Sequence, residues 1–423
     1  MADDWLVLIE SNTTGSGQLF CARARSLGLR PIVLARDPGR YPYVLADGIE
    51  SLVVDTASSD KVLDACAGLG GDRGRIAGVT SSSEYFVATA GEAARSLGLP
   101  HPDPQAVRSC RDKHAQRVRL RNAGLPCPDF AAADAPEAAV AAAARLGFPV
   151  VVKPLAGSGS IGTRKCTRSA EVLAAARYVL HTDPAKLALP QQQAVIVEEY
   201  LSGAEYSVET LGTQVVGITR KHLGPEPFFV EVGHDFPAPL DPTAQASISD
   251  VAVAALRALG LGWGPAHVEL RRTAAGPRII EVNPRLAGGM IPRIVEESCG
   301  IDMIGHVVAN AAGRVTTLQP TRSRSASIRF LVATTGGCLA EIDGIELARR
   351  LPGVAEIGVL CQAGQQVVLS HSFRDRLGYV IAVAESGSVA ARLADQAVAS
   401  LQPRIVTATF AAEGAPTAEC ASG

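Results

Sequence analysis

The chain has 423 residues, of which 47% are hydrophobic and 19% charged, and its formal net charge is −2 at pH 7. This length allows about two to four domains with a sizeable core. The near-neutral charge argues against nucleic acid as a partner, and no apolar run is long enough to span a membrane. We therefore expect an ordinary globular protein with neither a nucleic-acid nor a membrane partner.

The cysteine pattern indicates the redox compartment. The nine cysteines are scattered and contain no CxxC pair. In a chain of this length, that pattern predicts reduced thiols and not a disulfide framework or a zinc site. The first residues lack a basic segment followed by a cleavage site, so we expect no signal peptide and a cytoplasmic location.

Short apolar runs alternate with helical patterns in the first hundred residues. The runs cover residues 5–10, 31–35, 51–55 and 76–80, with a helical pattern over 16–27. Alternation of this kind predicts a doubly wound α/β domain, here residues 1–104.

The first turn of this domain carries a partial dinucleotide fingerprint. Gly15 and Gly17 are followed by Asp37 at a suitable distance, but Phe20 occupies the third glycine position. A turn without phosphate, or a turn facing a small substrate, is therefore favoured over an NAD site.

The next segment predicts two helices and a strand. Residues 105–124 read as one helix that contains Lys113 and ends at Gly124. An Ala-rich stretch at 131–144 favours a second helix that Gly147 closes. Residues 148–153 then form a β-branched run that ends in Lys153.

A glycine-rich loop, residues 156–163, follows this strand directly. Its backbone amides, at Gly157, Gly159 and Gly162 among others, can cradle phosphates, and the hydroxyls of Ser158 and Ser160 can add to them. The spacing also fits a P-loop, but Thr163 stands where that motif requires lysine. We favour a mobile loop that covers phosphates, with its lysine on the preceding strand; a plain flexible hairpin is the alternative.

Acidic residues follow the next predicted strand, residues 194–201, which comes after a loop at 183–193. The segment contains Glu198, Glu199, Tyr200 and Leu201, and its backbone can pair with an adenine edge. Glu205 follows a turn and is placed to reach a ribose. Alternation predicts that Glu205, Ser207 and Glu209 share one face of a strand.

Two histidines have two interpretations each. His234 lies in a Pro-rich stretch, residues 228–240, before a long helix at 243–259. We predict a loop there, and loops often carry binding residues, so a substrate contact and a packing role both stay open. For His267 we favour structural support of its strand.

The stretch from residue 268 to 283 predicts a hairpin with its turn at 273–277. Glu269 and Glu281 then lie on neighbouring strands, and Asn283 points to the same face as Glu281. Two carboxylates and an amide oxygen suit Mg²⁺, which keeps waters and shares its shell with phosphates. A surface hairpin with solvated ion pairs is the alternative.

Cationic and small residues follow this hairpin. Arg285 and Arg293 are catalytic candidates, because guanidinium groups bind phosphoryl and carboxylate oxygens. Gly288 and Gly289 allow close approach of a ligand, and a helix is predicted to begin near Ile291.

From residue 321 to about 410, the pattern predicts a small α+β module with short strands. These strands are predicted at 326–332, 354–360, 366–370 and 379–383. Residues 374–378 are polar and expected to be exposed, and the module reads as a lid or packing domain. Residues 411–423 read as a disordered tail.

Taken together, these motifs resemble the ATP-grasp superfamily over about residues 1–315. The resemblance is specific because Lys113, the strand with Lys153, the glycine loop, residues 197–209, Glu269 and residues 281–285 occur in the family's order. It implies an α/β and α+β fold: a Rossmann-like domain (1–104), an ATP-grasp lid subdomain (105–195), a large subdomain (196–320) and a C-terminal module (321–410).

For the nucleotide, the resemblance implies a role for each matching position. Lys113 and Lys153 would bind the ATP phosphates, and loop 156–163 would form the lid over them. Glu198 would contact the adenine side and Glu205 the ribose. For the metal and the reaction, Glu269, Glu281 and Asn283 would hold Mg²⁺, with Mn²⁺ as an alternative, and Arg285 would lie at an acyl phosphate.

Within the superfamily, the chain resembles the L-amino-acid ligases, which are dipeptide-forming carboxylate–amine ligases. In that group His234 and Arg285 would frame an amino-acid pocket. Gly288, Gly289 and Met290 follow, and the small size of the two glycines predicts an open pocket wall. The resemblance also implies amino-acid substrates and a homodimer.

The implied activity is ATP-dependent joining of a carboxylate to an amine through an acyl phosphate, in peptide or natural-product synthesis. A first alternative is another ATP-grasp ligase with a non-amino-acid carboxylate. A second is a nucleotide-binding protein without catalysis. An NAD oxidoreductase rests on the N-terminal fingerprint alone.

Overall fold

The computed structural model describes residues 4–12, 16–70, 74–183 and 192–406. Gly15 of the N-terminal fingerprint, most of the predicted loop at 183–193 and the predicted tail lie outside these residues. The chain divides into two compact units. Unit 1 comprises residues 1–128, 201–218 and 240–322, and unit 2 comprises residues 129–200, 219–239 and 323–423. The predicted large subdomain, residues 196–320, therefore contributes to both units.

Unit 1 begins with a parallel sheet of four strands, in the order β3-β2-β1-β4. The strands are β1 (Trp5–Ile9), β2 (Arg30–Ala35), β3 (Glu50–Val53) and β4 (Ile76–Thr80). Their apolar side chains are buried along β1 and most of β2, as a parallel sheet with helices on both faces requires. The doubly wound architecture predicted from the sequence is confirmed.

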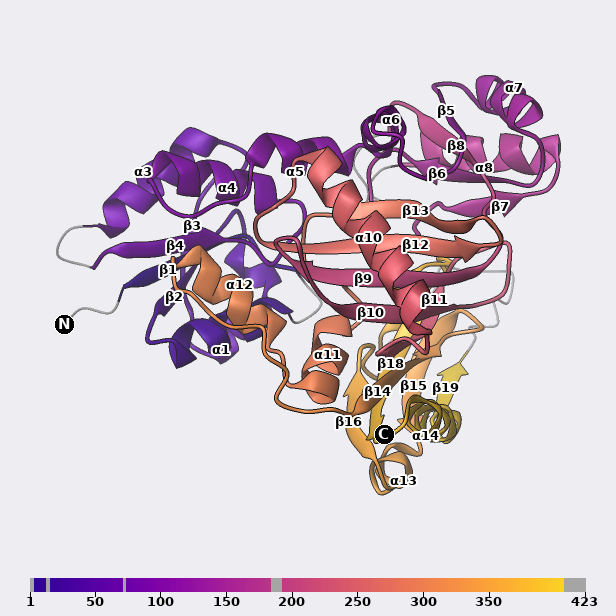
Figure 1. Ribbon diagram of the computed structural model, residues 1–423. Helices are drawn as coiled ribbons and strands as arrows, with labels where there is room; N and C mark the ends of the chain where they lie inside the picture. Colours follow the sequence, from indigo (N-terminus) through magenta and orange to yellow (C-terminus); the bar gives the residue numbers. More distant parts are fainter. Residues whose placement is uncertain (1–3, 13–15, 71–73, 184–191, 407–423) are drawn as a thin grey trace, which may run out of the picture. The chain divides into compact units, whose positions relative to one another are not determined.

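Helices cover both faces of this sheet (Figure 1). The first face packs against α1 (Ser16–Ser26) and α12 (Met303–Ala311), and the second against α3 (Ser59–Leu69) and α4 (Val87–Ser96). α12 thus returns to the N-terminal sheet from far along the chain.

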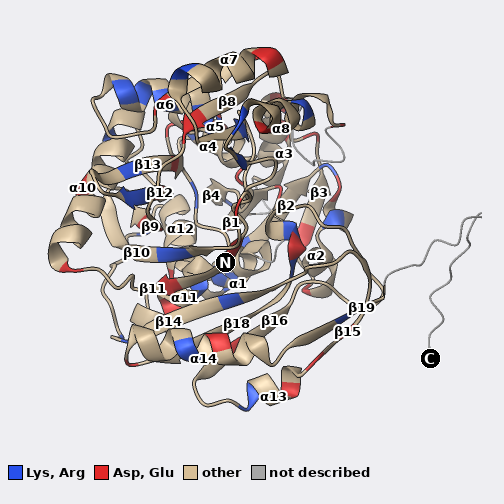
Figure 2. Ribbon diagram, turned by 90° about the vertical axis from the view of Figure 1, so that its right-hand side faces the viewer, with Lys and Arg blue, Asp and Glu red and all other residues tan. Residues whose placement is uncertain are grey.

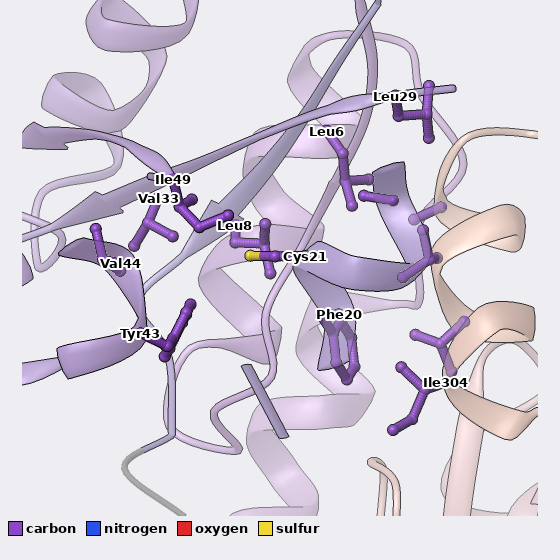
Figure 3. Close-up of a cluster of buried hydrophobic side chains, with 14 of the residues drawn as sticks. Leu6, Leu8, Phe20, Cys21, Leu29, Val33, Tyr43, Val44, Ile49 and Ile304 are labelled. Atoms are coloured by element: carbon purple, nitrogen blue, oxygen red, sulfur yellow. The ribbon is translucent and has the colours of Figure 1, made fainter. Parts of the chain in front are cut away.

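The core of the first face joins β1 to these two helices (Figure 3). Leu6 and Leu8 of β1 pack with Phe20 of α1 and Ile304 of α12. Burying each such side chain stabilises the fold by about 1.5–3 kcal/mol. The opposite face of β1 contributes Val7 to a second cluster.

Residues 104–122 form two helices, so the single helix predicted there is wrong. α5 (Pro104–Arg111) ends at Asp112, whose extended backbone starts α6 (Lys113–Asn122). The Asp112 carboxylate accepts a hydrogen bond from the amide of Ala115, which caps α6. Lys113 consequently occupies the first position of a helix.

The rest of unit 1 is an antiparallel sheet with helices. Its strands β9 (Ala204–Leu211), β12 (Pro265–Thr273) and β13 (Gly276–Asn283) lie in the order β13-β12-β9. The β12–β13 turn is shorter than predicted, because Thr273 and Gly276 are already paired. The accompanying helices are α10 (Pro242–Leu259), which packs on β12 and β13, and α11 (Ile291–Cys299). Strand β10 (Gln214–Leu223) starts in unit 1 and continues into unit 2.

Unit 2 contains a four-stranded antiparallel sheet with one face covered by α7 (Pro136–Leu146) and α8 (Ser169–His181). Its strands are β5 (Phe130–Ala133), β8 (Val195–Glu199), β6 (Val150–Pro154) and β7 (Arg164–Cys166), in that spatial order. The Ala-rich stretch predicted as one helix therefore begins as a strand. Alanine has the highest helix propensity, but intrinsic propensity is a weak determinant, and pairing with β8 overrides it.

Unit 2 also contains neighbouring strands in the order β10-β11-β14-β18-β16, so strands of the predicted C-terminal module belong to the same sheet as β10 and β11. Its further strands are β11 (Glu231–Phe236), β14 (Ser325–Val332), β18 (Arg376–Ala384) and β16 (Val354–Val359). α14 (Gly387–Ala399) packs on it, and a small sheet is formed by β17 (Gln366–Val367), β15 (Gly337–Asp343) and β19 (Gln402–Val406). The remaining short helices are α2 (Pro42–Ala46) and α13 (Ile345–Arg349).

Three local predictions fail in unit 2. The stretch around His234 is strand β11, not a loop. The strand predicted at 366–370 is only two residues long. Asp375 and Arg376, which were expected to be exposed, are buried at 3% and 8% exposure.

The distribution of charged residues and the hydropathy of the helices agree with what the composition predicts. Basic and acidic residues are interspersed within each unit (Figure 2). Among the described residues, no helix has the length and apolar character needed to cross a membrane.

Candidate functional site

The strand register of unit 1 brings the predicted metal ligands onto one face. Glu269 of β12 lies opposite Glu281 of β13, and His267 lies opposite Asn283. Directly opposed residues of an antiparallel pair point to the same side of the sheet. Glu269, Glu281 and Asn283 therefore share a face, as the sequence predicted.

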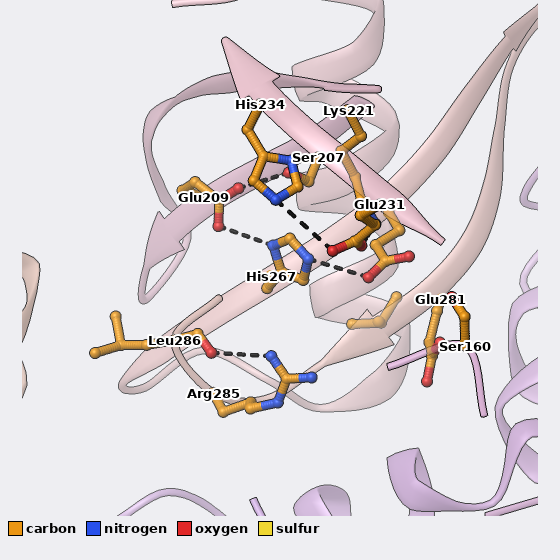
Figure 4. Close-up of polar contacts among 12 residues, drawn as sticks. Ser160, Ser207, Glu209, Lys221, Glu231, His234, His267, Glu281, Arg285 and Leu286 are labelled. Carbon is orange, nitrogen blue, oxygen red and sulfur yellow. Dashed lines mark hydrogen bonds and ion pairs between the residues drawn. The ribbon is translucent and has the colours of Figure 1, made fainter. Parts of the chain in front are cut away.

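A chain of buried hydrogen bonds runs across this face (Figure 4). Ser207 donates to Glu209 over 2.7 Å, and the other oxygen of Glu209 lies 2.9 Å from His267 Nδ1. His267 Nε2 lies 3.1 Å from Glu269 Oε1. Burial opposes charge on His267, but the carboxylates of Glu209 and Glu269 outweigh it and raise its pKa to about 9. His267 therefore positions Glu269, in line with the structural role favoured from the sequence.

Lys113 contacts the second carboxylate of the same face. Its ammonium nitrogen lies 3.1 Å from Glu281 Oε1, and the lysine side chain is only 9% exposed. Gln116, one turn along α6, exchanges two hydrogen bonds with the backbone of Val282, at 2.8 and 2.9 Å. These two hydrogen bonds fix the start of α6 against β13, and they thereby fix the position of Lys113.

The chemistry of this face fits a hard cation that is only partly bound by protein. In the described part of the chain, no group of three or more His, Cys, Asp and Glu side chains is arranged to hold a metal. Mg²⁺ in nucleotide sites commonly takes one or two carboxylates and completes its shell with water and phosphate. Glu269 and Glu281 with the Asn283 amide meet that requirement. Lys113 and His267 balance the two carboxylates.

Arg285 lies just beyond β13 and pairs with a residue that the sequence analysis did not single out. Its Nε donates to Glu84 Oε2 over 2.6 Å, and a second nitrogen donates to the Leu286 carbonyl over 3.0 Å. Burial opposes the charge, but Glu84 raises the pKa of Arg285 above its usual value. Glu84 follows β4, where ligands of parallel sheets bind beyond the carboxyl ends of the strands. That position was the signal that could have identified it.

The predicted pocket wall has an unusual backbone. Met290 is the N-cap of α11 and has a left-handed φ of 60°. A Cβ added to Gly288 would meet no atom within 4 Å, so there is open space beside it. Gly289 adopts φ of 58°. Arg293 pairs with Glu296 and Glu297 of its own helix, at 3.2 and 2.8 Å.

The predicted ribose contact is also buried in unit 1. Glu205 is 8% exposed, and its carboxylate accepts a hydrogen bond from Arg271 Nε over 3.1 Å. Arg271 also donates to the Leu201 carbonyl over 2.7 Å. The predicted shared face of Glu205, Ser207 and Glu209 is present, because these residues alternate along β9 and pair with β12.

In unit 2, the predicted nucleotide residues gather on the sheet that contains β6 and β8. Lys153 Nζ lies 2.6 Å from Glu198 Oε2, and both side chains are buried. Both point away from the face covered by α7 and α8, because Val152 and Val197 alternate with them and pack under those helices. The Lys153–Glu198 pair thus lies buried on the sheet face opposite to α7 and α8.

The residues that follow β8 bind nearby protein groups. Glu199 accepts from the backbone amide of Asp129 over 3.3 Å. The Tyr200 hydroxyl donates to Glu226 over 2.7 Å, and Lys165 Nζ lies 3.9 Å from the centre of its ring. Tyr200 and Lys165 thereby link the end of β8 to the start of β7.

The glycine loop joins β6 to β7, as predicted. Gly157, Gly159 and Gly162 all have positive φ, at 138°, 66° and 69°. Ser160 has a left-handed φ of 62° and donates its hydroxyl to the Phe229 carbonyl over 2.8 Å. Ser158 is half-buried. The loop therefore has a defined conformation with its glycines where other residues would be strained.

His234 belongs to a second buried cluster in unit 2 (Figure 4). The carboxylate of Glu231 lies 2.7 Å from Lys221 Nζ, 2.8 Å from Arg376 and 3.7 Å from His234 Nε2. Burial opposes charge on Glu231, but these cationic neighbours hold its pKa well below the usual value. The ring of His234 packs edge-on against Phe330. Arg376 was missed from the sequence, since its stretch read as an exposed turn.

Two family models match the chain. An ATP-grasp domain matches residues 146–293, and the L-amino acid ligase C-terminal domain 2 matches residues 329–406. The uncharacterized protein y4rH of Sinorhizobium fredii is 41% identical over 396 residues, covering 94% of this chain and 82% of y4rH.

One further relative and one solved structure are both named as L-amino acid ligases. The L-arginine-specific L-amino acid ligase of Bacillus subtilis is 23% identical over 305 residues, covering 68% of this chain and 70% of that protein. The crystal structure of the L-amino acid ligase from Bacillus licheniformis has a TM-score of 0.78 and 23% identity, covering 96% of this chain and all of that one (100%). Its likeness confirms the predicted fold. The chain belongs to the ATP-grasp family of ATP-dependent ligases that form C–N bonds, and it carries an L-amino acid ligase C-terminal domain.

Proposed function

We propose that this chain joins the carboxylate of one amino acid to the amine of another, with ATP converted to ADP and phosphate. The observation that carries the proposal is the face of unit 1 on which Lys113, Glu269 and Glu281 lie together. A lysine beside two carboxylates suits a phosphate chain with its bound cation. The matched C-terminal domain supports amino acids as substrates.

In this reaction, the substrate carboxylate attacks the γ-phosphorus of ATP, and ADP leaves. The resulting acyl phosphate is attacked at its carbon by the amine, the C–O bond breaks, and phosphate departs with the proton balance completed by solvent. Both steps change the charge on oxygen atoms of the carboxylate or the phosphate, so positioned cations are the main requirement. Nucleophilic catalysis by serine or cysteine is not needed.

We assign phosphate binding to Lys113, Lys153 and the glycine loop. Glu269, Glu281 and Asn283 would hold Mg²⁺, or Mn²⁺, which would neutralise phosphate oxygens when bound. We assign the adenine contact to residues 198–201 and the ribose contact to Glu205. In the present structure each carboxylate has a cationic protein partner, such as Lys153 for Glu198 and Arg271 for Glu205. Ligand binding would exchange these partners.

Substrate contacts are assigned to four groups of residues. Arg285 carries a half-buried guanidinium suited to a carboxylate or acyl phosphate, and Arg293 is a second candidate. His234 is assigned to the amino-acid substrate, as part of the Glu231 cluster. Gly288, Gly289 and Met290 form the proposed open wall, and the space beside Gly288 supports a substrate side chain larger than a methyl group. The B. subtilis relative is named as specific for L-arginine, an amino acid with a large side chain, which agrees with this assignment.

The proposal is tested with purified protein, MgATP and a matrix of paired amino acids. We expect ADP release to require two amino acids and to yield a product whose mass equals their sum less water. Release with a single non-amino-acid carboxylate and an amine would favour the alternative ligase. ATP binding without release for any pair would favour a non-catalytic nucleotide-binding protein. The proposed cytoplasmic location and the homodimer are tested separately, by fractionation and by light scattering.

A further inference from the structure

The glycine loop of unit 2 lies against a turn of the C-terminal module. This turn, residues 371–376, contains a short helix at Phe373–Asp375 and follows β17. The Phe373 amide donates to the Gly159 carbonyl over 3.4 Å. A Cβ built on Gly159 would overlap the Phe373 ring, so the aromatic ring lies directly on the loop backbone.

A second contact lies beside the first. Ser160 donates to the Phe229 carbonyl, and the neighbouring Phe228 ring stacks on His371 at 3.9 Å between centroids and 4° between planes. The backbone amide of Lys165 donates to the Pro227 carbonyl over 2.9 Å. The loop therefore contacts both Phe229 and the turn, and the neighbouring residues Phe228 and His371 contact each other.

The turn itself is firmly anchored. The buried Asp375 accepts hydrogen bonds from the amide and hydroxyl of Ser370, at 2.8 and 2.7 Å. Arg376 binds the carbonyl and carboxylate of Glu231, at 3.0 and 2.8 Å. Since both ends of the turn are fixed by buried groups, it can serve as a platform for the loop.

Backbone strain concentrates at this contact. Four described residues other than glycine have a left-handed φ. Two of them lie at this contact: Ser160 in the loop and His371 in the turn. Such conformations persist only where the surroundings hold them, and they cluster at ligand clamps.

We propose that Phe373 is a positioning residue for the ligase reaction: it holds the glycine loop in place over the ATP phosphates. The proposal rests on the function proposed above and gives the C-terminal module a role in it. An acyl phosphate is lost if water reaches it, so a loop held in place raises the fraction of activated carboxylate that meets the amine. Phe373 acts through the loop and touches no reacting atom.

The direct test is hydrogen exchange of the peptide covering residues 156–165 in the full-length protein, without substrates. We expect Phe373→Ala to speed exchange there by about three- to tenfold, the range expected when one aromatic contact is lost. Tyr178→Ala removes a half-exposed ring from α8 and serves as the matched control. Phe373→Leu keeps an apolar side chain without the ring and should give a smaller change in the same direction, so it tests the contact even if Phe373→Ala folds poorly.

Kinetics then tests the role in the reaction. In Phe373→Ala, KM for ATP should rise several-fold and phosphate released per product should exceed one, while Tyr178→Ala keeps a ratio of one. Gly159→Ala should be less harmful in the Phe373→Ala background than alone, because the ring that its methyl group meets is gone. Unchanged loop exchange in both Phe373→Ala and Phe373→Leu would overturn the proposed contact. Faster exchange with unchanged KM and coupling would overturn its catalytic role. Because exchange needs no substrate, failure of the ligase proposal would be seen separately.

Discussion

At the scale of single residues, the candidate site consists of charges held in pairs whose members are buried or half-buried. Glu269 pairs with His267, Glu281 with Lys113, and Arg285 with Glu84. Removing one member of such a pair leaves a buried charge without compensation, which costs far more than an exposed pair contributes. The site is therefore sensitive to neutral replacements that hardly change shape.

For His267, the effect of such a replacement on the free energy of unfolding should depend on pH. Its pKa of about 9 in the folded chain exceeds the ordinary value of 6.5, so its stabilising effect is complete below pH 6.5 and is lost as pH rises through 9. We expect His267→Asn to lower the free energy of unfolding at pH 6 by on the order of 2–3 kcal/mol without metal. The difference from wild type should narrow by pH 9.5. Urea unfolding at both pH values measures it, and an equal difference at both would contradict the ion-pair account.

At the scale of elements, helix ends and strand registers place the charged groups. The β9–β12–β13 register aligns the carboxylates, and the start of α6 places Lys113. The sequence predicts the alignment well, because alternation along a strand is a local property. The sequence does not predict the break between α5 and α6, because Asp112 and its neighbours look like one continuous polar face of a helix. Only the structure shows that the Asp112 carboxylate caps α6.

The cap at Asp112 can be tested directly. Asp112→Ala removes the bond to the Ala115 amide and should lower the free energy of unfolding by about 1 kcal/mol. It should also raise KM for ATP, because Lys113 is the next residue. Asp112→Asn keeps a capping oxygen and should retain most of both properties. Equal losses in the two variants would indicate that the charge, and not the cap, matters.

At the scale of the whole molecule, both units carry groups that the proposed reaction needs. Unit 1 carries Lys113 and the carboxylates of the hairpin, and unit 2 carries Lys153 and the glycine loop. The order of these motifs made the family predictable from the sequence alone. Glu84 and Arg376 escaped prediction because their partners, Arg285 and Glu231, lie 201 and 145 residues away along the chain. Pairs at such separations leave no pattern in the local sequence.

The central claim is that a carboxylate is activated by phosphorylation, and oxygen transfer tests it most directly. The measurement uses an amino acid with ¹⁸O in its carboxylate and mass spectrometry of the released phosphate. The matched variant is Glu281→Gln, which should stay folded and release no labelled phosphate. We predict that the wild-type protein transfers one ¹⁸O atom to phosphate for each product formed. Unlabelled phosphate, or AMP with pyrophosphate in place of ADP, would contradict the account.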